Sequence, residues 1–124
     1  MGIMTENYKK HLDAFTRGDI DEAFSYIHDD IVWYPNRSMR PVHGKAAMRA
    51  FIDKWSREMS GMDYKQTLII EHGNFLFVEG TEKYVRSGKQ VETFYAGVVE
   101  WKDGKAIAWR DYFDLKTLEK QLAS

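Results

Sequence analysis

Residues 97–118 read G-V-V-E-W-K-D-G-K-A-I-A-W-R-D-Y-F-D-L-K-T-L, and this stretch decides the fold. Two strand-like runs flank Asp103-Gly104. An Asp-Gly pair between alternating runs is the strongest short-range signal for a two-residue hairpin, because both central positions need a positive φ. The stretch therefore predicts an antiparallel hairpin whose second strand ends near Phe113.

The second strand of this hairpin carries an acid on an apolar face. Period-two alternation places Asp111 on one face with three apolar side chains, Ile107, Trp109 and Phe113. A carboxylate among apolar side chains is costly unless it is paired or hydrogen-bonded, and burial raises its pKa. An acid/base catalyst in an apolar pocket has these properties. The alternative is a structural carboxylate bonded to backbone or to a neighbouring Lys or Arg.

The rest of the chain predicts helices first and strands later. Apolar positions at helical spacing indicate helices over residues 5–16, 20–27 and 45–59, with a short strand at 31–34. From Asp63 the period changes to two and predicts four strands, followed by a closing helix over 115–122; the strands lie at about 63–71, 75–86, 90–101 and 105–113. This order favours an α+β fold, with helices packed on one face of a curved antiparallel sheet and an apolar cavity between them. The side chains expected to be largely buried there are Phe15, Phe24, Phe51, Trp55, Trp109 and Phe113.

Composition excludes several classes of function. The 124 residues indicate one domain, 1–124, and 18 basic against 19 acidic side chains with no basic run argue against a nucleic-acid partner. The absence of cysteine excludes a disulfide framework, a thiolate nucleophile and a Cys-ligated zinc. No apolar run approaches the length of a membrane span, so we expect no membrane association and a cytoplasmic location. No histidine or carboxylate spacing resembles a metal site, so no metal is expected.

Three features together resemble the SnoaL-like branch of the nuclear transport factor 2-like superfamily, over essentially the whole chain. They are the order of helices, Pro41-x-x-Gly44 before the third helix, and the closing strands. The segment A-W-R-D-Y-F-D-L, from Ala108 to Leu115, is most similar to limonene epoxide hydrolases. The resemblance implies a cone-shaped curved antiparallel sheet with three N-terminal helices on its concave face, a cystatin-like roll. It also implies an isomerase, dehydratase, cyclase or hydrolase that acts on a small apolar or oxygenated metabolite without cofactor or metal.

The site residues of the epoxide hydrolases carry over only in part. Tyr34-Pro35-Asn36 matches the Tyr-x-Asn pair that holds a water, and Asp111 matches the water-binding aspartate. A gapless register through residues 74–86 places Thr81 at the family's arginine and Lys83 at its proton-donating acid. This departure argues against epoxide hydrolysis.

Several side chains keep alternative interpretations. Lys83 is a charge partner for Asp111, a Schiff-base nucleophile, or a surface residue. Glu79 shares its strand parity and is a candidate second carboxylate. Tyr34 and Asn36 either orient a water or belong to an ordinary turn.

The predicted site therefore has a catalytic set and a substrate-binding set. Asp111 is the expected base or water holder, with Tyr34 and Asn36 as orienting donors and Lys83 as acid or charge partner. The substrate-binding set comprises Trp33, Trp55, Thr81, Glu79, Trp109 and Phe113. The second hypothesis is a non-catalytic binding module for an apolar small molecule. We also expect a homodimer through the convex face of the sheet, with Trp101, Tyr112 and Tyr84 as candidate contacts.

Overall fold

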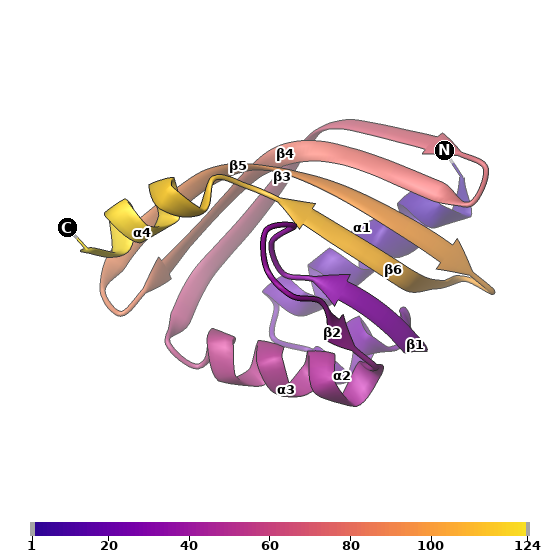
Figure 1. Ribbon diagram of the computed structural model, residues 1–124, viewed down its shortest axis with the longest axis horizontal. Helices are drawn as coiled ribbons and strands as arrows, with labels where there is room; N and C mark the ends of the chain where they lie inside the picture. Colours follow the sequence, from indigo (N-terminus) through magenta and orange to yellow (C-terminus); the bar gives the residue numbers. More distant parts are fainter. Residues whose placement is uncertain (1, 124) are drawn as a thin grey trace.

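A six-stranded sheet curves around three helices in the computed structural model, which describes residues 2–123 (Figure 1). The strand order is β2-β1-β6-β5-β4-β3. In chain order the elements are α1 (Ile3–Thr16), α2 (Ile20–Phe24), β1 (Ile27–Tyr34), β2 (Val42–His43), α3 (Lys45–Ser56), β3 (Met59–His72), β4 (Phe75–Arg86), β5 (Lys89–Lys102), β6 (Lys105–Tyr112) and α4 (Leu115–Ala123). The predicted α+β class, curved sheet and four-strand meander are confirmed.

The first part of the sheet differs from the prediction. Strand β1 begins at Ile27 rather than near residue 31, and the short strand β2 was not predicted. The pairing of β1 with β6 is parallel, so the sheet is not wholly antiparallel. The polar run His28-Asp29-Asp30 lacks the apolar alternation of a strand, so the sequence pattern does not indicate the start of β1. A register shift between Ile27 and Val32 also interrupts the pairing of β1 with β6 there.

The hairpin between β5 and β6 is the predicted two-residue turn. Asp103 and Gly104 have φ of 53° and 78°, and Lys102 pairs with Lys105. A bulge then follows in β6, because Ala106 pairs with Trp101 while Ala108 pairs with Glu100. The predicted place of Ile107 in the apolar face is therefore wrong, and Ala106 is fully buried in its stead. Trp109, Asp111 and Phe113 do share the concave face, where all three line the cavity.

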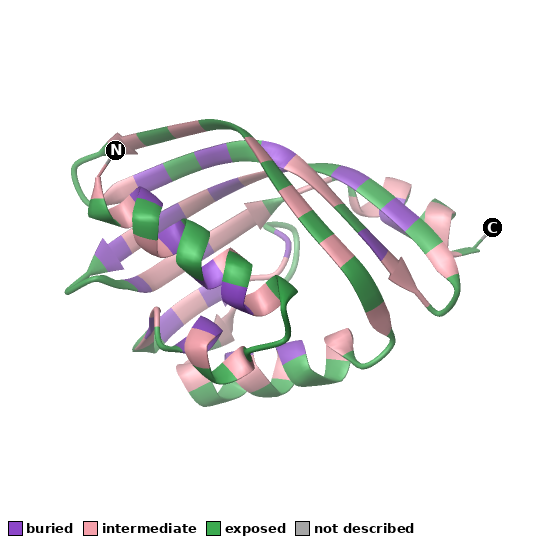
Figure 2. Cartoon of the chain, turned by 180° about the vertical axis from the view of Figure 1, so that it is seen from behind, coloured by how far each residue is buried: buried purple, intermediate pink, exposed green. Residues whose placement is uncertain are grey.

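Burial alternates along the central strands, as Figure 2 shows. In β5 the odd-numbered residues from Val91 to Trp101 point inward. Trp101 is 5% exposed and Tyr84 is 4% exposed, so their predicted place on the convex face is wrong. Strand parity explains both corrections, because Trp101 shares the parity of Val99, which is fully buried, and Tyr84 that of Leu76 and Val78. Of the aromatic side chains expected in the core, Phe24 and Trp109 are buried, whereas Phe15, Phe51, Trp55 and Phe113 are half-buried in the cavity wall.

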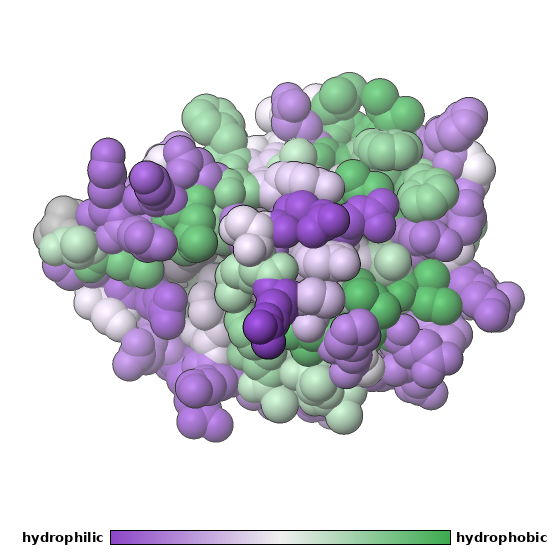
Figure 3. Space-filling view, viewed as in Figure 1, coloured by the Kyte–Doolittle hydropathy of each residue, from purple (hydrophilic) through white to green (hydrophobic). Residues whose placement is uncertain are grey.

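The convex face of the sheet exposes large apolar side chains on four strands. Hydrophobic side chains gather at the upper right of Figure 3, over β3, β4 and β5. The exposed set on this face, hereafter the convex patch, is Leu68, Ile70, Phe77, Phe94 and Tyr112. Phe94 is 81% exposed, the largest value among them.

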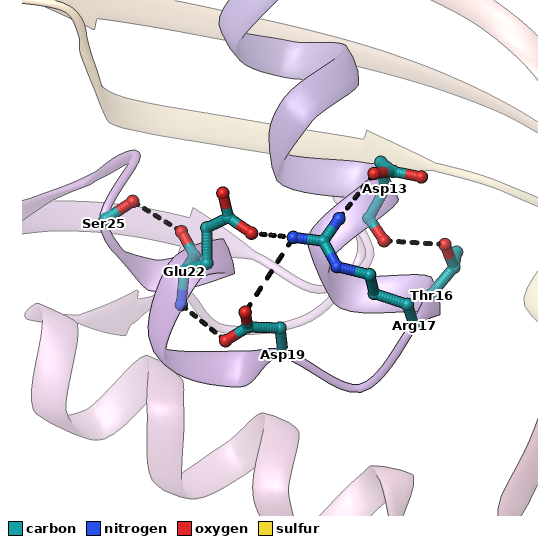
Figure 4. Close-up of polar contacts among 6 residues, drawn as sticks. All are labelled: Asp13, Thr16, Arg17, Asp19, Glu22 and Ser25. Carbon is teal, nitrogen blue, oxygen red and sulfur yellow. Dashed lines mark hydrogen bonds and ion pairs between the residues drawn. The ribbon is translucent and has the colours of Figure 1, made fainter.

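A polar corner joins α1 to α2 (Figure 4). Gly18 has φ 84°, which suits the residue after a helix, and the Asp19 carboxylate accepts a hydrogen bond of 3.1 Å from the Glu22 amide. The Arg17 guanidinium lies between the carboxylates of Asp13, at 2.5 Å, and Glu22. These contacts fix where α2 begins relative to α1. Over residues 2–123, no helix is long and apolar enough to cross a membrane.

Candidate active site

A cavity of about 290 Å³ lies between the concave face of the sheet and the helices. Its walls are mostly aromatic. Helix α1 supplies Tyr8, His11 and Phe15, and the remaining aromatic side chains are Trp33, Phe51, Trp55, Tyr64, Tyr84, Tyr95, Trp109 and Phe113. Such a cavity suits a small apolar molecule with a few polar groups.

Asp111 lies inside this cavity and is held by two indole groups. Trp33 Nε1 donates to Oδ2 at 3.1 Å, and Trp109 Nε1 donates to Oδ1 at 3.0 Å. Burial raises the pKa of Asp111 to about 6, although both indole hydrogen bonds lower it. A carboxylate can accept further hydrogen bonds at each oxygen, so Asp111 can still bind a water or a substrate hydroxyl.

Glu82 is a second carboxylate in the same cavity, and the sequence analysis missed it. Tyr64 Oη donates to Glu82 Oε1 at 3.2 Å. Burial, and then the negative charge of Asp111, raise the pKa of Glu82 to about 7, while the Tyr64 hydrogen bond lowers it. The sequence signal was present: Leu76, Val78, Gly80, Glu82 and Tyr84 alternate along β4, so an acid interrupts an apolar face as in β6.

The two carboxylates form one titrating pair. The negative charge of Asp111 contributes to the raised pKa of Glu82, which is the higher of the two. Between about pH 6 and 7 the pair therefore holds about one proton, mainly on Glu82, with Asp111 mostly ionised. An ionised base and a protonated acid in one apolar cavity can exchange protons with a bound molecule at two positions.

The residues predicted on β4 lie on the wrong side of the sheet. Lys83 is exposed and pairs with Glu92, its cross-strand neighbour, at 3.8 Å. Glu79 and Thr81 line a shallow hollow over the convex face together with Phe94. A register shift of one residue turns every side chain of a strand to the opposite face. The gapless register predicted for residues 74–86 is displaced in this way. The inward positions of β4 are Gly80 and Glu82.

The predicted catalytic residues Tyr34 and Asn36 do not line the cavity. Alternate residues of this extended segment face opposite sides, and Trp33 and Pro35 are the ones that face the cavity. Tyr34 lies beneath the Arg37 guanidinium, which is 4.5 Å from the ring centroid. Asn36 is buried and donates to the Phe113 carbonyl at 2.8 Å, while its Oδ1 accepts from the Ser38 amide at 2.9 Å. Asn36 therefore fastens the loop after β1 to the end of β6. The other predicted wall residues, Trp33, Trp55, Trp109 and Phe113, all line the cavity.

Besides the two carboxylates, the polar groups that line the cavity are several hydroxyls, the imidazole of His11 and the guanidinium of Arg86. The hydroxyls of Tyr8 and Tyr95 lie 3.2 Å apart. Burial raises the pKa of Tyr64 well above its usual value, so this side chain stays a neutral donor. Among the described residues, no three histidine or carboxylate side chains are grouped to hold a metal ion.

Sequence comparison assigns the family. The model of the SnoaL-like domain matches residues 8–109. The chain belongs to the SnoaL-like domain family. The predicted resemblance to the nuclear transport factor 2-like superfamily is thereby confirmed, and so is the similarity to epoxide hydrolases of the limonene type.

Three relatives of this SnoaL-like domain illustrate its similarity to known proteins. The epoxide hydrolase EphG of Mycobacterium tuberculosis is 27% identical over 111 residues, which cover 90% of this chain and 73% of EphG. An LEH-like epoxide hydrolase structure from M. tuberculosis matches with a TM-score of 0.84 at 24% identity, over 98% of this chain and 92% of that one. An NTF2-like protein of unknown function from Burkholderia pseudomallei has a TM-score of 0.88 at 21% identity, with both chains fully covered. The two structural matches concern the fold alone.

Proposed function

We propose that this protein is an enzyme that acts on a small, uncharged, oxygenated molecule by general acid–base catalysis, with Asp111 as the base and Glu82 as the acid. The observation that carries the proposal is the carboxylate pair itself, half-buried in the wall of one aromatic cavity with raised pKa values of about 6 and 7. Structural carboxylates are usually paired with a cation, and neither of these has a cationic partner among the described residues.

The two indole groups support the role of Asp111 as base. They donate to one oxygen each, so they fix the plane of the carboxylate and leave lone pairs for a water or a substrate proton. Glu82 is largely protonated below about pH 7 and can transfer its proton to a substrate oxygen. The Tyr64 hydroxyl, which donates to Glu82, would stabilise the carboxylate that remains after the transfer.

Hydrolysis of an epoxide is the first reaction to test. With the register of β4 corrected by one residue, Glu82 falls at the position of the family's proton-donating acid and Gly80 at that of its arginine. The acid would thus be present as a glutamate, while the arginine is missing and the Tyr-x-Asn pair lies outside the cavity. In such a reaction Asp111 removes a proton from water, the water oxygen bonds to a ring carbon, the carbon–oxygen bond breaks, and Glu82 protonates the released oxygen. The named relative EphG is an epoxide hydrolase, which favours this candidate over isomerisation, dehydration or cyclisation by the same pair.

The test is a turnover assay with limonene oxide and styrene oxide, in which the diols are measured by gas chromatography. Diol formation that is lost in Asp111→Asn and in Glu82→Gln supports the proposal. Glu79→Gln is the matched control, because this carboxylate lies on the other face of the sheet. Ligand binding without turnover in any substrate class would favour the alternative, a non-catalytic binding module on the same fold.

We further propose that a second copy of this chain covers the convex patch. The patch places five large exposed apolar side chains on one sheet face, and single-copy proteins rarely expose such a surface. The predicted contact Tyr112 belongs to it. A cytoplasmic location stays a prediction.

A further inference from the structure

His11 is a cavity residue that the proposed acid–base pair does not use. It lies on α1 and is only 8% exposed. Its ring stacks on Phe15, with centroids 6.4 Å apart and planes at 6°, and packs against Trp109 at 5.2 Å. Trp109 in turn donates to Asp111. Packing against Phe15 and Trp109 thus fixes the imidazole beside the indole that holds the proposed base.

The proton of this imidazole is on Nδ1. His11 Nδ1 lies 2.8 Å from the Ala23 carbonyl oxygen, and since a carbonyl only accepts, Nδ1 is the donor. Burial lowers the pKa of His11, so the ring is neutral at pH 7 and Nε2 carries a lone pair. The Ala23 carbonyl belongs to α2, whose start is fixed by the polar corner of Asp13, Arg17, Asp19 and Glu22.

The other nitrogen, Nε2, has no donor among residues 2–123. The single enclosed side-chain polar atom without a partner in this part of the chain is Trp101 Nε1, so His11 Nε2 is not enclosed. Nε2 therefore keeps some accessible surface, and His11 is one of the residues that line the cavity. A ligand that displaces water from this acceptor must supply a donor in its place, because an acceptor left unpaired in a closed site is costly.

We propose that His11 Nε2 accepts a hydrogen bond from a hydroxyl group that the substrate carries in addition to the oxygen on which the acid–base pair acts, so that the cavity selects hydroxyl-bearing molecules (phenols, enols or alcohols) over their methyl ethers. This inference rests on the proposed function, since it names the substrate class of the same cavity. His11 is a binding residue here and transfers no proton. The contact between His11 and Trp109 places the hydroxyl-bearing end of the substrate near Asp111.

The test compares 2-naphthol with 2-methoxynaphthalene, in which a methyl group replaces the hydroxyl hydrogen and removes the donor. Dissociation constants are measured by calorimetry for the wild type and for His11→Phe, which keeps an aromatic ring between Phe15 and Trp109. We expect the wild type to prefer the naphthol about five- to tenfold, the value of one hydrogen bond. In His11→Phe this preference should fall to about one (the limit of no discrimination), with the affinity for the ether unchanged.

Nitrogen-15 NMR of the wild-type histidines gives a second readout that needs no variant. The His11 ring should be the neutral Nδ1–H form at pH 7, and its Nε2 resonance should move with 2-naphthol and not with the ether. A preference that survives in His11→Phe, an Nε2–H form, an unmoved Nε2 resonance, or no binding of either probe overturns the inference.

The failure of this inference is distinct from failure of the proposed function. If the naphthol preference survives in His11→Phe but disappears in Glu82→Gln, a carboxylate is the acceptor, and the inference fails while the acid–base pair stands. If the His11 results are as expected while Asp111→Asn and Glu82→Gln leave turnover intact, the cavity binds a hydroxyl as inferred and the proposed function fails.

Discussion

Trp33 and Trp109 are direct neighbours in the parallel pairing of β1 with β6, and their indole nitrogens bind the two different oxygens of Asp111. The pairing of two strands that are distant in sequence thereby builds the cradle of the carboxylate. Each N–H donor stabilises the ionised acid, which opposes the effect of burial on the pKa. Without the indoles, Asp111 would be protonated over more of the physiological range.

Replacing Trp33 with Phe should raise the pKa of Asp111 above about 6, because one of its two donors is lost. Carbon-13 NMR of the Asp111 carboxyl during a pH titration measures the shift. Above pH 7 the variant should also be less stable to urea by about 1–3 kcal/mol, the cost of removing a hydrogen bond from a buried charge. Trp55→Phe is the control, because Trp55 lines the same cavity without bonding to Asp111. An equal titration midpoint in Trp33→Phe and wild type would contradict the role given to the indole.

The raised pKa of Glu82 predicts that its ionisation destabilises the folded protein. The folded pKa is about 7 and the ordinary value is 4.5, so between these values the folded state binds more protons than the unfolded state. The free energy of unfolding therefore falls as pH rises from about 4.5 to 7, by about 3 kcal/mol from this group, and levels off above. Glu82→Gln removes the charge, so its stability relative to wild type should grow across this window.

Urea unfolding from pH 4.5 to 8 tests this linkage. Glu79→Gln, a substitution of an exposed side chain on the opposite face, should show no such growth. A constant difference between Glu82→Gln and wild type at all pH values would mean that Glu82 is solvated in the folded state.

The contrast between Asp111 and Glu82 explains how far the sequence could be interpreted. Asp111 was found because it interrupts an apolar face next to an Asp-Gly turn, and a family motif fixes its register. Glu82 interrupts an apolar face in the same way, but the gapless match to the family motif places Thr81 and Lys83 at the inward positions of β4, one residue away from the observed Gly80 and Glu82. The partner strand bulges between Gln66 and Leu68, where a Cβ on Gly80 would lie 2.0 Å from the Lys65 carbonyl oxygen. The indole cradle depends on the parallel pairing of β1 with β6, which no local pattern encodes.

The acid–base pair predicts a bell-shaped dependence of kcat/KM on pH. Activity requires Asp111 ionised and Glu82 protonated, so the limbs should fall near pH 6 and 7 with the maximum between them. Glu82→Gln should lower kcat/KM by about 10²–10⁴-fold and remove the limb near pH 7, because the proton donor is gone. Rates with whichever oxide is turned over give this profile. Lys83→Met should leave the profile unchanged, since Lys83 pairs with Glu92 on the convex side. A shift of the pH dependence of kcat/KM in Lys83→Met would show that Lys83 acts in the site.

The convex patch predicts the assembly of the protein. If a second copy covers it, sedimentation at micromolar concentration should give about twice the mass of one 14.6 kDa chain. Phe94→Glu should reduce the mass to that of a single chain, because a charge at the most exposed residue of the patch would have to be buried without a partner. Ile3→Glu is the matched control: Ile3 is 61% exposed but lies on α1, so this charge should leave the mass unchanged. Wild-type sedimentation at the mass of one chain would show that the convex patch is not a dimer interface. Loss of the dimer in Ile3→Glu instead would place the interface on the helical side of the molecule.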